Sequence, residues 1–375
     1  MGFDSFLGNS SAKALVLGMA SSHRVSGALL FTGPEGVGKK TLALMLAKAM
    51  NCERQNGDFC GKCSHCLKAE EMLADTREDA DRRRLIKDAQ KRVEGLMYFD
   101  LQLIEPFTRY ILIEQVRKMR NVAYTRPFQL PRRVFIVDQA QAVHWQAVDL
   151  LLKMLEEPPE STTFILVCPN GYELRPTIRS RCRRVQFLPV DDGLIAEILE
   201  RDGKLTGAQK ALAVRVAGGS VAAAKTLDLA QFERRRRPWL DFLDAVAGPA
   251  QRAGKTGAGV TSATTSNWPL IFDSAKALTE SRADFQEELR IGFTLLRDIM
   301  QTLESPEGAQ VVNLDLQPRL KGWASSLGLA GVERLKRGLD EAYRLQTRNV
   351  NQQLGLEALA ADLASSRTGS PLVRE

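Results

Sequence analysis

A glycine-rich segment near the start of the chain has the residue types needed to bind phosphate. An apolar run, residues 28–31, leads into three spaced glycines and a lysine: Gly33, Gly36, Gly38 and Lys39. Glycines let the backbone curl so that its N–H groups converge on an anion, and the lysine can reach the outer phosphates. The spacing predicts a P-loop between a strand and a helix, with a plain glycine turn as the alternative.

The residue after Lys39 does not fit a P-loop that binds Mg²⁺. A Ser or Thr hydroxyl is expected at that position as a ligand of the metal. This chain has Lys40 instead. The sequence therefore predicts the P-loop fold but leaves ATP binding doubtful.

A carboxylate that could hold Mg²⁺ through water follows a second apolar run. Residues 134–137 are apolar and lead to Asp138, as in a Walker B strand that carries an acid to the carboxyl end of a sheet. Its neighbour Gln139 is an amide, which cannot take up a proton from water at neutral pH. Asp138 is thus predicted to belong to a degenerate nucleotide site, and the alternative is an ordinary acidic residue at a strand end.

Four of the six cysteines crowd into a short segment: Cys52, Cys60, Cys63 and Cys66. The sequence has no secretion signal, so disulfides are not expected, and thiolates at C-x-x-C spacing can close a tetrahedral Zn²⁺ site. Residues 52–66 are therefore predicted to form a structural zinc module with no open position on the metal. Two alternatives remain, namely free or redox-active cysteines, and His65 replacing one cysteine as a ligand.

Five short apolar runs, separated by helical patterns, must position these residues. Such runs predict strands buried on both faces, which are typical of a parallel, doubly wound α/β sheet. The predicted strands cover residues 28–31, 101–104, 134–138, 164–167 and 185–187. Apolar residues at helical spacing predict one helix around residues 12–19 and another that begins near Lys39.

Two highly charged stretches are predicted to be solvent-exposed helices. Over residues 68–95, acids and bases mix at helical spacing, which indicates a solvated helical insertion without an assigned function. The arginine run 234–237 could contact DNA, but four adjacent residues point all round a helix and form no single stripe. A solvated helix face is therefore favoured for this run.

Length and composition limit the classes of protein. A chain of 375 residues suggests two or three domains. No run of about 18 apolar residues could cross a membrane, and residues 1–7 are too short and too polar for a signal peptide. A cytoplasmic protein without a membrane partner is expected. The net charge of +7 permits a nucleic-acid partner without requiring one.

Changes of composition along the chain predict its domains. After residue 188 the strand pattern gives way to helices, and residues 248–267 are mostly small or polar, as in a flexible linker. The predicted parts are an α/β P-loop domain over 1–188, a small helical lid over 189–247, that linker, and an all-α domain over 268–375.

Several motifs together resemble one protein family. They are residues 6–9, the P-loop, the four cysteines, Asp138, residues 155–159 and 176–182, and near the end residues 349–351 with Leu354, Leu356, Glu357 and Leu359. Over nearly its full length the chain resembles the AAA+ proteins of the bacterial DNA polymerase III clamp loader, and most of all their delta-prime type. The resemblance implies an AAA+ module with a zinc-bearing insertion, a lid, and a C-terminal collar that joins a ring of subunits.

The resemblance also gives Arg181 a role that spacing alone does not predict. In the Ser-Arg-Cys motif it implies an arginine finger that reaches across a subunit interface to the γ-phosphate of a neighbour's ATP. A guanidinium suits that task because it stays charged and presents a planar fork to phosphate oxygens. The alternative is a solvated basic strand edge, formed by Arg179, Arg181, Arg183 and Arg184.

Four departures from the ATP-hydrolysing members of the family point to a subunit that does not hydrolyse ATP. They are Lys40, Gln139, Cys168 with Pro169, and Ala222 in place of a lid arginine. The resemblance then implies a subunit that braces a hetero-oligomer with gamma/tau-like ATPases and a delta-like subunit. In that assembly it would help to load the sliding clamp on primed DNA.

Two other functions remain as alternatives. One is an ATP-hydrolysing, gamma/tau-like motor subunit of the same clamp loader, which Lys40 and Gln139 argue against. The other is a zinc-dependent nucleic-acid-binding module, which needs basic and aromatic residues around the cysteines. That segment has one Phe and few Lys nearby, so this function is the least favoured.

Overall fold

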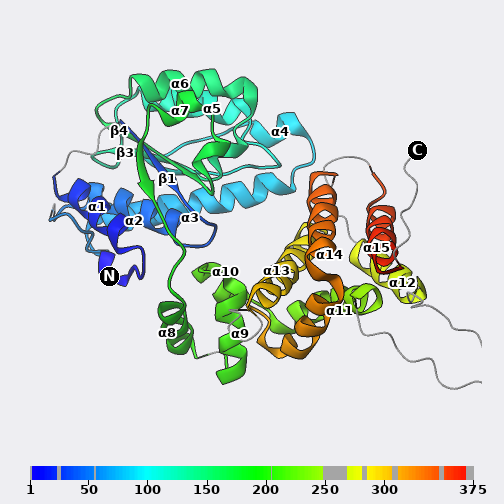
Figure 1. Cartoon of the computed structure of the whole chain (residues 1–375). Coiled ribbons are helices and arrows are strands. Elements are labelled where there is room, and N and C mark those ends of the chain that lie inside the picture. The colour runs from blue at the N-terminus through cyan, green and yellow to red at the C-terminus, as the bar shows by residue number, and fades with distance from the viewer. Residues whose placement is uncertain are drawn as a thin grey trace, which may run out of the picture. The chain divides into compact units, whose positions relative to one another are not determined.

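The computed structural model describes residues 2–22, 27–54, 56–203, 205–247, 268–280, 285–305, 311–345 and 350–368. They form two compact units, Met1–Lys204 with Ala217–Lys225, and Leu205–Val216 with Thr226–Glu375. Figure 1 shows a sheet with helices in the first unit and helices alone in the second. The predicted linker, residues 248–267, lies outside the described residues.

Five parallel strands form the sheet of the first unit in the order β2-β3-β4-β1-β5. Their bounds are Gly27–Thr32 (β1), Leu101–Ile104 (β2), Arg133–Val137 (β3), Thr162–Cys168 (β4) and Arg183–Gln186 (β5). The prediction of a five-stranded parallel sheet is therefore confirmed. Because β4 lies between β1 and β3, the P-loop and Asp138 project from strands that are not hydrogen-bonded to each other.

Helices cover both faces of this sheet. Figure 1 shows α5, α6 and α7 on one face and α1, α2 and α3 on the other. The helices are α1 (Ser10–Ser21), α2 (Lys39–Asn51), α3 (Ser64–Leu85), α4 (Ala89–Val93), α5 (Ile113–Ala123), α6 (Val148–Glu156), α7 (Pro176–Arg179), α8 (Asp192–Asp202) and α10 (Val221–Thr226). Strands β1 to β4 are mostly apolar because they are buried between two helical layers. The edge strand β5 differs, because only Val185 of its four residues is buried.

The charged insertion is only partly the solvated helix that its composition indicates. Helix α3 has a buried face that includes Ala69, Met72, Leu73 and Ala80, and it packs against the edge strand β2. These apolar residues recur three or four positions apart among the charges, which places them on one side of the helix. The prediction of a fully solvated helix was wrong because a thin apolar stripe is sufficient to cover one sheet edge.

The second unit is entirely helical in its described residues, which confirms the predicted helical C-terminal region. Its helices are α9 (Gly207–Ala217, the last residue of which belongs to the first unit), α11 (Leu229–Ala247), α12 (Trp268–Leu278), α13 (Phe285–Glu304), α14 (Gln317–Leu345) and α15 (Gln352–Thr368). Trp239, Leu289 and Trp323 are buried in its core. Among the described helices, none is both long enough and apolar enough to cross a membrane.

The predicted lid, residues 189–247, is divided between the two units. Helix α8 and all of α10 except its last residue, Thr226, belong to the unit with the sheet, whereas α11 contributes Trp239 and Phe242 to the core of the other unit. The periodicity of α11 shows an apolar face but not which unit that face joins.

One arginine of the run on α11 is buried, contrary to the prediction of a solvated face. Arg236 is 7% exposed and donates to Asn313 Oδ1 at 2.9 Å and to the two carboxylate oxygens of Asp315 at 3.0 and 2.6 Å. Nearby, the fully buried carboxylate of Asp298 accepts the backbone N–H groups of Val312 and Asn313 at 2.9 and 2.8 Å. Sequence pattern alone could not distinguish Arg236 from its exposed neighbours.

Replacing Arg236 with alanine is expected to lower the free energy of unfolding by about 1.5–3 kcal/mol, the usual size for hydrogen bonds to charged groups. The loss would leave Asn313 and Asp315 without their donor. Urea unfolding of the full chain measures the change in the free energy of unfolding. Arg234→Ala is the matched control, because Arg234 is exposed and its change should stay within about 0.5 kcal/mol. Equal losses in both variants would contradict this account.

Candidate functional site

A cavity of 620 Å³ lies beside the P-loop at the carboxyl end of the sheet. It is lined by residues 35–41 of the P-loop and by Asp138 and Gln139 after β3, with Ala222 and Lys225 on α10. Its size falls within the range of about 300–1,000 Å³ that is usual for small-ligand pockets. This is the site at which the predicted nucleotide residues meet.

The P-loop backbone needs glycine at its tight positions. Gly33, Gly36 and Gly38 have φ values of 146°, 73° and 98°. A Cβ at Gly33 would lie 2.3 Å from the carbonyl oxygen of Phe187, and one at Gly36 would lie 2.0 Å from Ser220 Oγ. The curled loop thus depends on its three glycines, and it opens α2, a helix of 13 residues.

Lys39 is turned onto its own loop. Its Nζ donates to the carbonyl oxygens of Gly33 and Pro34, both at 2.5 Å, and the residue is buried. Burial lowers the pKa of Lys39, although nearby acids oppose the change. A phosphate in the cavity would have to compete with these two carbonyls for the ammonium.

Lys40 forms the central ion pair of the site. Its Nζ lies 2.9 Å from Glu105 Oε1 and 3.0 Å from Asp138 Oδ2. Burial alone would lower the pKa of Lys40, but the two carboxylates outweigh this effect and raise it. The remaining oxygen of Asp138, Oδ1, accepts the backbone N–H of Gln139 at 3.0 Å. Both oxygens of the Walker B carboxylate are therefore engaged within the protein.

Three charged residues of this region were not predicted from the sequence. Glu105 follows β2 directly, and Arg84 on α3 contacts it at 2.6 Å. Lys225, one helical turn after Ala222, lines the cavity and lies 2.9 Å from the carboxylate of Asp202. The position of Glu105 directly after a buried strand could have identified it as a site residue. Lys225 could have been identified from its helical spacing to Ala222. No local signal pointed to Arg84.

The departures from an ATP-hydrolysing site lie around the same cavity. Lys40, Gln139, Cys168 and Ala222 all line it, and so does Pro169. Gln139 has a left-handed backbone with a φ of 52°. Burial raises the pKa of Cys168 to about 11, so its thiol stays protonated and offers no base at neutral pH. The sequence placed these positions in one site correctly.

Arg181 is not among the described residues that line this cavity. It follows α7, where its Nε donates to Glu156 Oε1 at 2.7 Å and another guanidinium nitrogen donates to the carbonyl oxygen of Thr177 at 2.9 Å. Its side chain is 35% exposed. Glu156 ends α6 and starts the acidic-proline motif, so two of the motifs from the sequence contact each other.

The four cysteine sulfurs gather in one place. Those of Cys52, Cys60, Cys63 and Cys66 all lie within 4.8 Å of one another. The sulfurs of Cys52 and Cys63 are 4.0 Å apart, close to the ~3.8 Å that tetrahedral Zn–S bonds of 2.3 Å imply. Cys52 ends α2 while Cys63 and Cys66 begin α3, so the cluster joins two helix ends.

Backbone N–H groups point at these sulfurs. The N–H of Cys60 lies 3.4 Å from the Cys52 sulfur, that of Cys63 3.3 Å from the Cys60 sulfur, and that of Cys66 3.4 Å from the Cys63 sulfur. Such donors stabilise thiolates, which are the form that ligates metal. His65 instead places Nδ1 3.1 Å from the carbonyl oxygen of Asn51. The donor set therefore fits a tetrahedral zinc ion held by four sulfurs.

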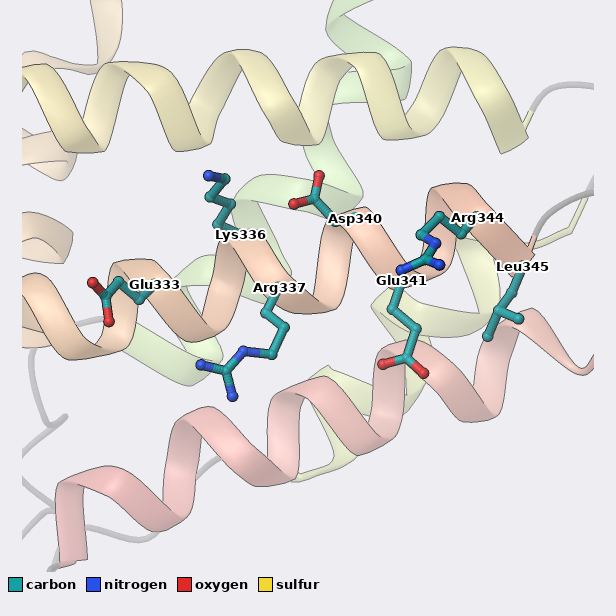
Figure 2. A pocket seen from close by; sticks show the side chains of 7 residues that line it. All are labelled: Glu333, Lys336, Arg337, Asp340, Glu341, Arg344 and Leu345. Carbon is teal, nitrogen blue, oxygen red and sulfur yellow. The ribbon is translucent and has the colours of Figure 1, made fainter.

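A larger hollow of 920 Å³ lies on α14 but lacks the features of a ligand site. Figure 2 shows its lining, in which Arg337 and Glu341 point toward α15. Three acids and three bases line it with a single leucine. Opposite charges recur four residues apart, as on exposed helix faces that stabilise themselves. We therefore assign no ligand to it.

Comparison with known proteins identifies the family. Residues 8–191 match a family model described as "DNA polymerase III, delta subunit". This region belongs to the AAA+ clamp-loader family of DNA polymerase III. The clamp-loader relatives include the gamma/tau subunit of Mycobacterium tuberculosis, 32% identical over 203 residues, which are 52% of this chain and 31% of that protein. The delta' subunit of Bacillus subtilis is 28% identical over 180 residues, which are 48% of this chain and 47% of that protein.

These clamp-loader matches agree on the family and differ on the subunit. The matched region spans less than half the length of each of the two relatives. Among solved structures, a gamma subunit-related protein of Thermotoga maritima is 15% identical, with 95% of this chain and 99% of that chain covered and a TM-score of 0.44. RuvB of the same organism is 16% identical, with 93% of this chain and 97% of that chain covered and a TM-score of 0.40. At such TM-scores, the family assignment depends on the sequence matches.

Proposed function

We propose that this protein is a delta-prime-like clamp-loader subunit that does not turn over ATP. The observation that carries the proposal is the 3.0 Å contact between Lys40 Nζ and Asp138 Oδ2. An ammonium thus pairs with the carboxylate that would hold Mg²⁺ in a hydrolysing relative. Without that metal, the charge that develops on a transferred phosphoryl group lacks its main counter-charge.

The rest of the cavity supports the same proposal. Gln139 cannot act as a general base. The carboxylates among the described lining residues are Asp138, which is paired, and Glu35, which is part of the P-loop itself. Neither is placed as a free base opposite the P-loop lysine, so a water molecule would bind there without activation.

We further propose that Arg181 acts on a neighbouring subunit. Its absence from the cavity of its own chain and its partial exposure favour a role in trans. A guanidinium remains charged at all physiological pH values and can exchange a carboxylate for phosphate oxygens without changing its geometry. The contact with Glu156 would keep the side chain extended and in position before assembly.

The cysteine cluster is proposed to hold one structural Zn²⁺ through Cys52, Cys60, Cys63 and Cys66. Four thiolates complete the tetrahedral shell, so the metal has no open position for a substrate or water. Its contribution is to join the end of α2 to the start of α3. The zinc module is therefore proposed to serve folding and not chemistry.

The proposed partners are gamma/tau-like ATPase subunits and a delta-like subunit, joined through the helices of residues 268–375 as a collar. The sliding clamp and primed DNA would be reached through that assembly. The alternative is an ATP-hydrolysing motor subunit. The observation in its support is the 32% identity to a gamma/tau subunit. Copurification of the chain with each candidate subunit tests the proposal, and failure to form any complex would refute it.

The isolated chain is expected to show no ATP turnover above background, because Lys40 pairs with Asp138 and Gln139 cannot act as a base. A steady-state phosphate-release assay with Mg²⁺ measures this. Turnover of about 1 per second, at the low end of typical enzymes, that disappeared in Lys39→Ala would instead identify the chain as a motor subunit.

A further inference from the structure

Four side chains form a line of alternating charge that ends at the nucleotide cavity. Arg84 contacts Glu105 at 2.6 Å, Glu105 contacts Lys40 at 2.9 Å, and Lys40 contacts Asp138 at 3.0 Å. Arg84 comes from α3, the helix of the charged insertion. The line therefore joins a segment without an assigned role to the P-loop.

This arrangement does not fit Mg²⁺. The metal takes six oxygen ligands at about 2.0–2.1 Å, and the hydroxyl that normally follows the P-loop lysine is replaced by the ammonium of Lys40. Asp138 already uses both carboxylate oxygens, one with Lys40 and one with the N–H of Gln139. A dication beside Asp138 would have to displace Lys40 or lie against a like charge.

Glu105 also holds Lys40 in this place. The Glu105 side chain is only 15% exposed, and its backbone oxygen accepts Gln115 Nε2 at 3.0 Å. Burial alone would raise the pKa of Glu105, but Lys40 and Arg84 outweigh burial and lower it, so the carboxylate is ionised at neutral pH. A partly buried, ionised glutamate with a cation on each side limits where Lys40 can go.

The features that bind phosphate are nevertheless present. The glycines keep the curled backbone, α2 presents its N-terminus, and Lys39 and Lys225 line the cavity with Lys40. An anion entering the cavity would meet three ammonium groups. That of Lys40 is fixed next to Asp138, the carboxylate that would hold Mg²⁺ in a hydrolysing relative. The charge that Mg²⁺ supplies in other P-loops is thus partly built into the protein.

We propose that this cavity binds a nucleoside triphosphate free of Mg²⁺, with Lys40 as a fixed internal cation, and that the α3 insertion serves to hold Lys40 there through Arg84 and Glu105. The proposal deepens the degenerate nucleotide site of the proposed function and rests on that cavity being the site. It gives the charged insertion a positioning role.

The test is calorimetric titration of the full-length protein with ATP, once in EDTA and once with excess MgCl₂. We expect wild-type protein to bind free ATP at least about fivefold more tightly than Mg·ATP, since a like-charge contact at ~4 Å is unfavourable even at the dielectric constant of water. In Lys40→Thr, which restores the hydroxyl, the preference should reverse in favour of Mg·ATP. Thermal unfolding of each variant confirms that it is folded.

The role of the insertion is tested separately. Arg84→Ala should reduce the preference for free ATP at least about twofold, because Glu105 would no longer be held from the α3 side. Arg82→Ala is the matched control, since Arg82 lies on the same helix and pairs with Asp79. It should leave the preference unchanged.

Three results would overturn the proposal. They are wild-type protein that binds no ATP at millimolar concentration in EDTA, wild-type protein that binds Mg·ATP more tightly, and Arg84→Ala that behaves as Arg82→Ala does. The first two refute the metal-free site, and the third refutes the role of α3. None of them concerns the action of Arg181 on a partner, so the proposed brace and finger functions stand or fall by different measurements.

Discussion

A clamp loader reconstituted with Arg181→Ala is expected to assemble normally and to lose most of the DNA-stimulated ATP turnover at the site that this arginine serves. Arginine fingers contribute about 10³ to 10⁵ in rate where they have been measured in GTPases. If other ATP sites in the ring keep their own arginines, the total ATPase will fall less than this, but clamp loading should drop clearly. ATPase and clamp-loading assays on the purified complex measure both.

The structure explains why folding should survive this change. The Arg181 side chain is partly exposed and contacts Glu156 and Thr177 at the surface, so its removal leaves no buried charge. Arg183→Ala is the matched control, because Arg183 lies on the same basic edge and is exposed. If Arg181→Ala and Arg183→Ala both retain wild-type activity in an intact complex, Arg181 is only part of a basic strand edge.

Cys63→Ser is expected to lose bound zinc and to destabilise the first unit severely. Apparent binding free energies of structural zinc in small zinc-finger peptides are about 10–16 kcal/mol at pH 7. That range is as large as the whole unfolding free energy of a typical domain, about 5–15 kcal/mol. Elemental analysis of protein purified without chelator measures the metal, and thermal unfolding measures the loss of stability.

His65→Ala provides the control for this experiment. Its ring nitrogen lies 3.1 Å from the Asn51 carbonyl oxygen, so its loss should leave the zinc content at one per chain. Undiminished zinc in Cys63→Ser, or lost zinc in His65→Ala, would show that the four-cysteine assignment is wrong.

The strands could be predicted from sequence, but their order could not. Strands β1 to β4 are mostly apolar runs because they are buried on both faces, and this signal is local. The insertion of β4 between β1 and β3 depends on how the crossover helices pack, which no local pattern records. The sequence therefore placed Asp138 at the correct end of the sheet without showing that another strand separates it from the P-loop.

The chemistry of the site was predictable wherever it depended on one position at a time. Lys40, Gln139 and Cys168 each depart from a known pattern, and all three line the cavity. The partner that fixes Lys40 was not predictable, because Glu105 is 65 residues away along the chain. The buried Arg236 was missed for the same reason, since its partners Asn313 and Asp315 are 77 and 79 residues distant.

The contact between Arg181 and Glu156 has a consequence for the proposed trans action. Because the guanidinium already has a carboxylate partner, a neighbour's nucleotide gains only the difference between two ion pairs when it recruits the arginine. A triphosphate carries more negative charge than the diphosphate that remains after hydrolysis, so it competes better with Glu156. The arginine would then move between two positions according to the neighbour's nucleotide. Glu156 at the end of α6 would therefore lose its contact with Arg181 only while the neighbour's triphosphate is intact.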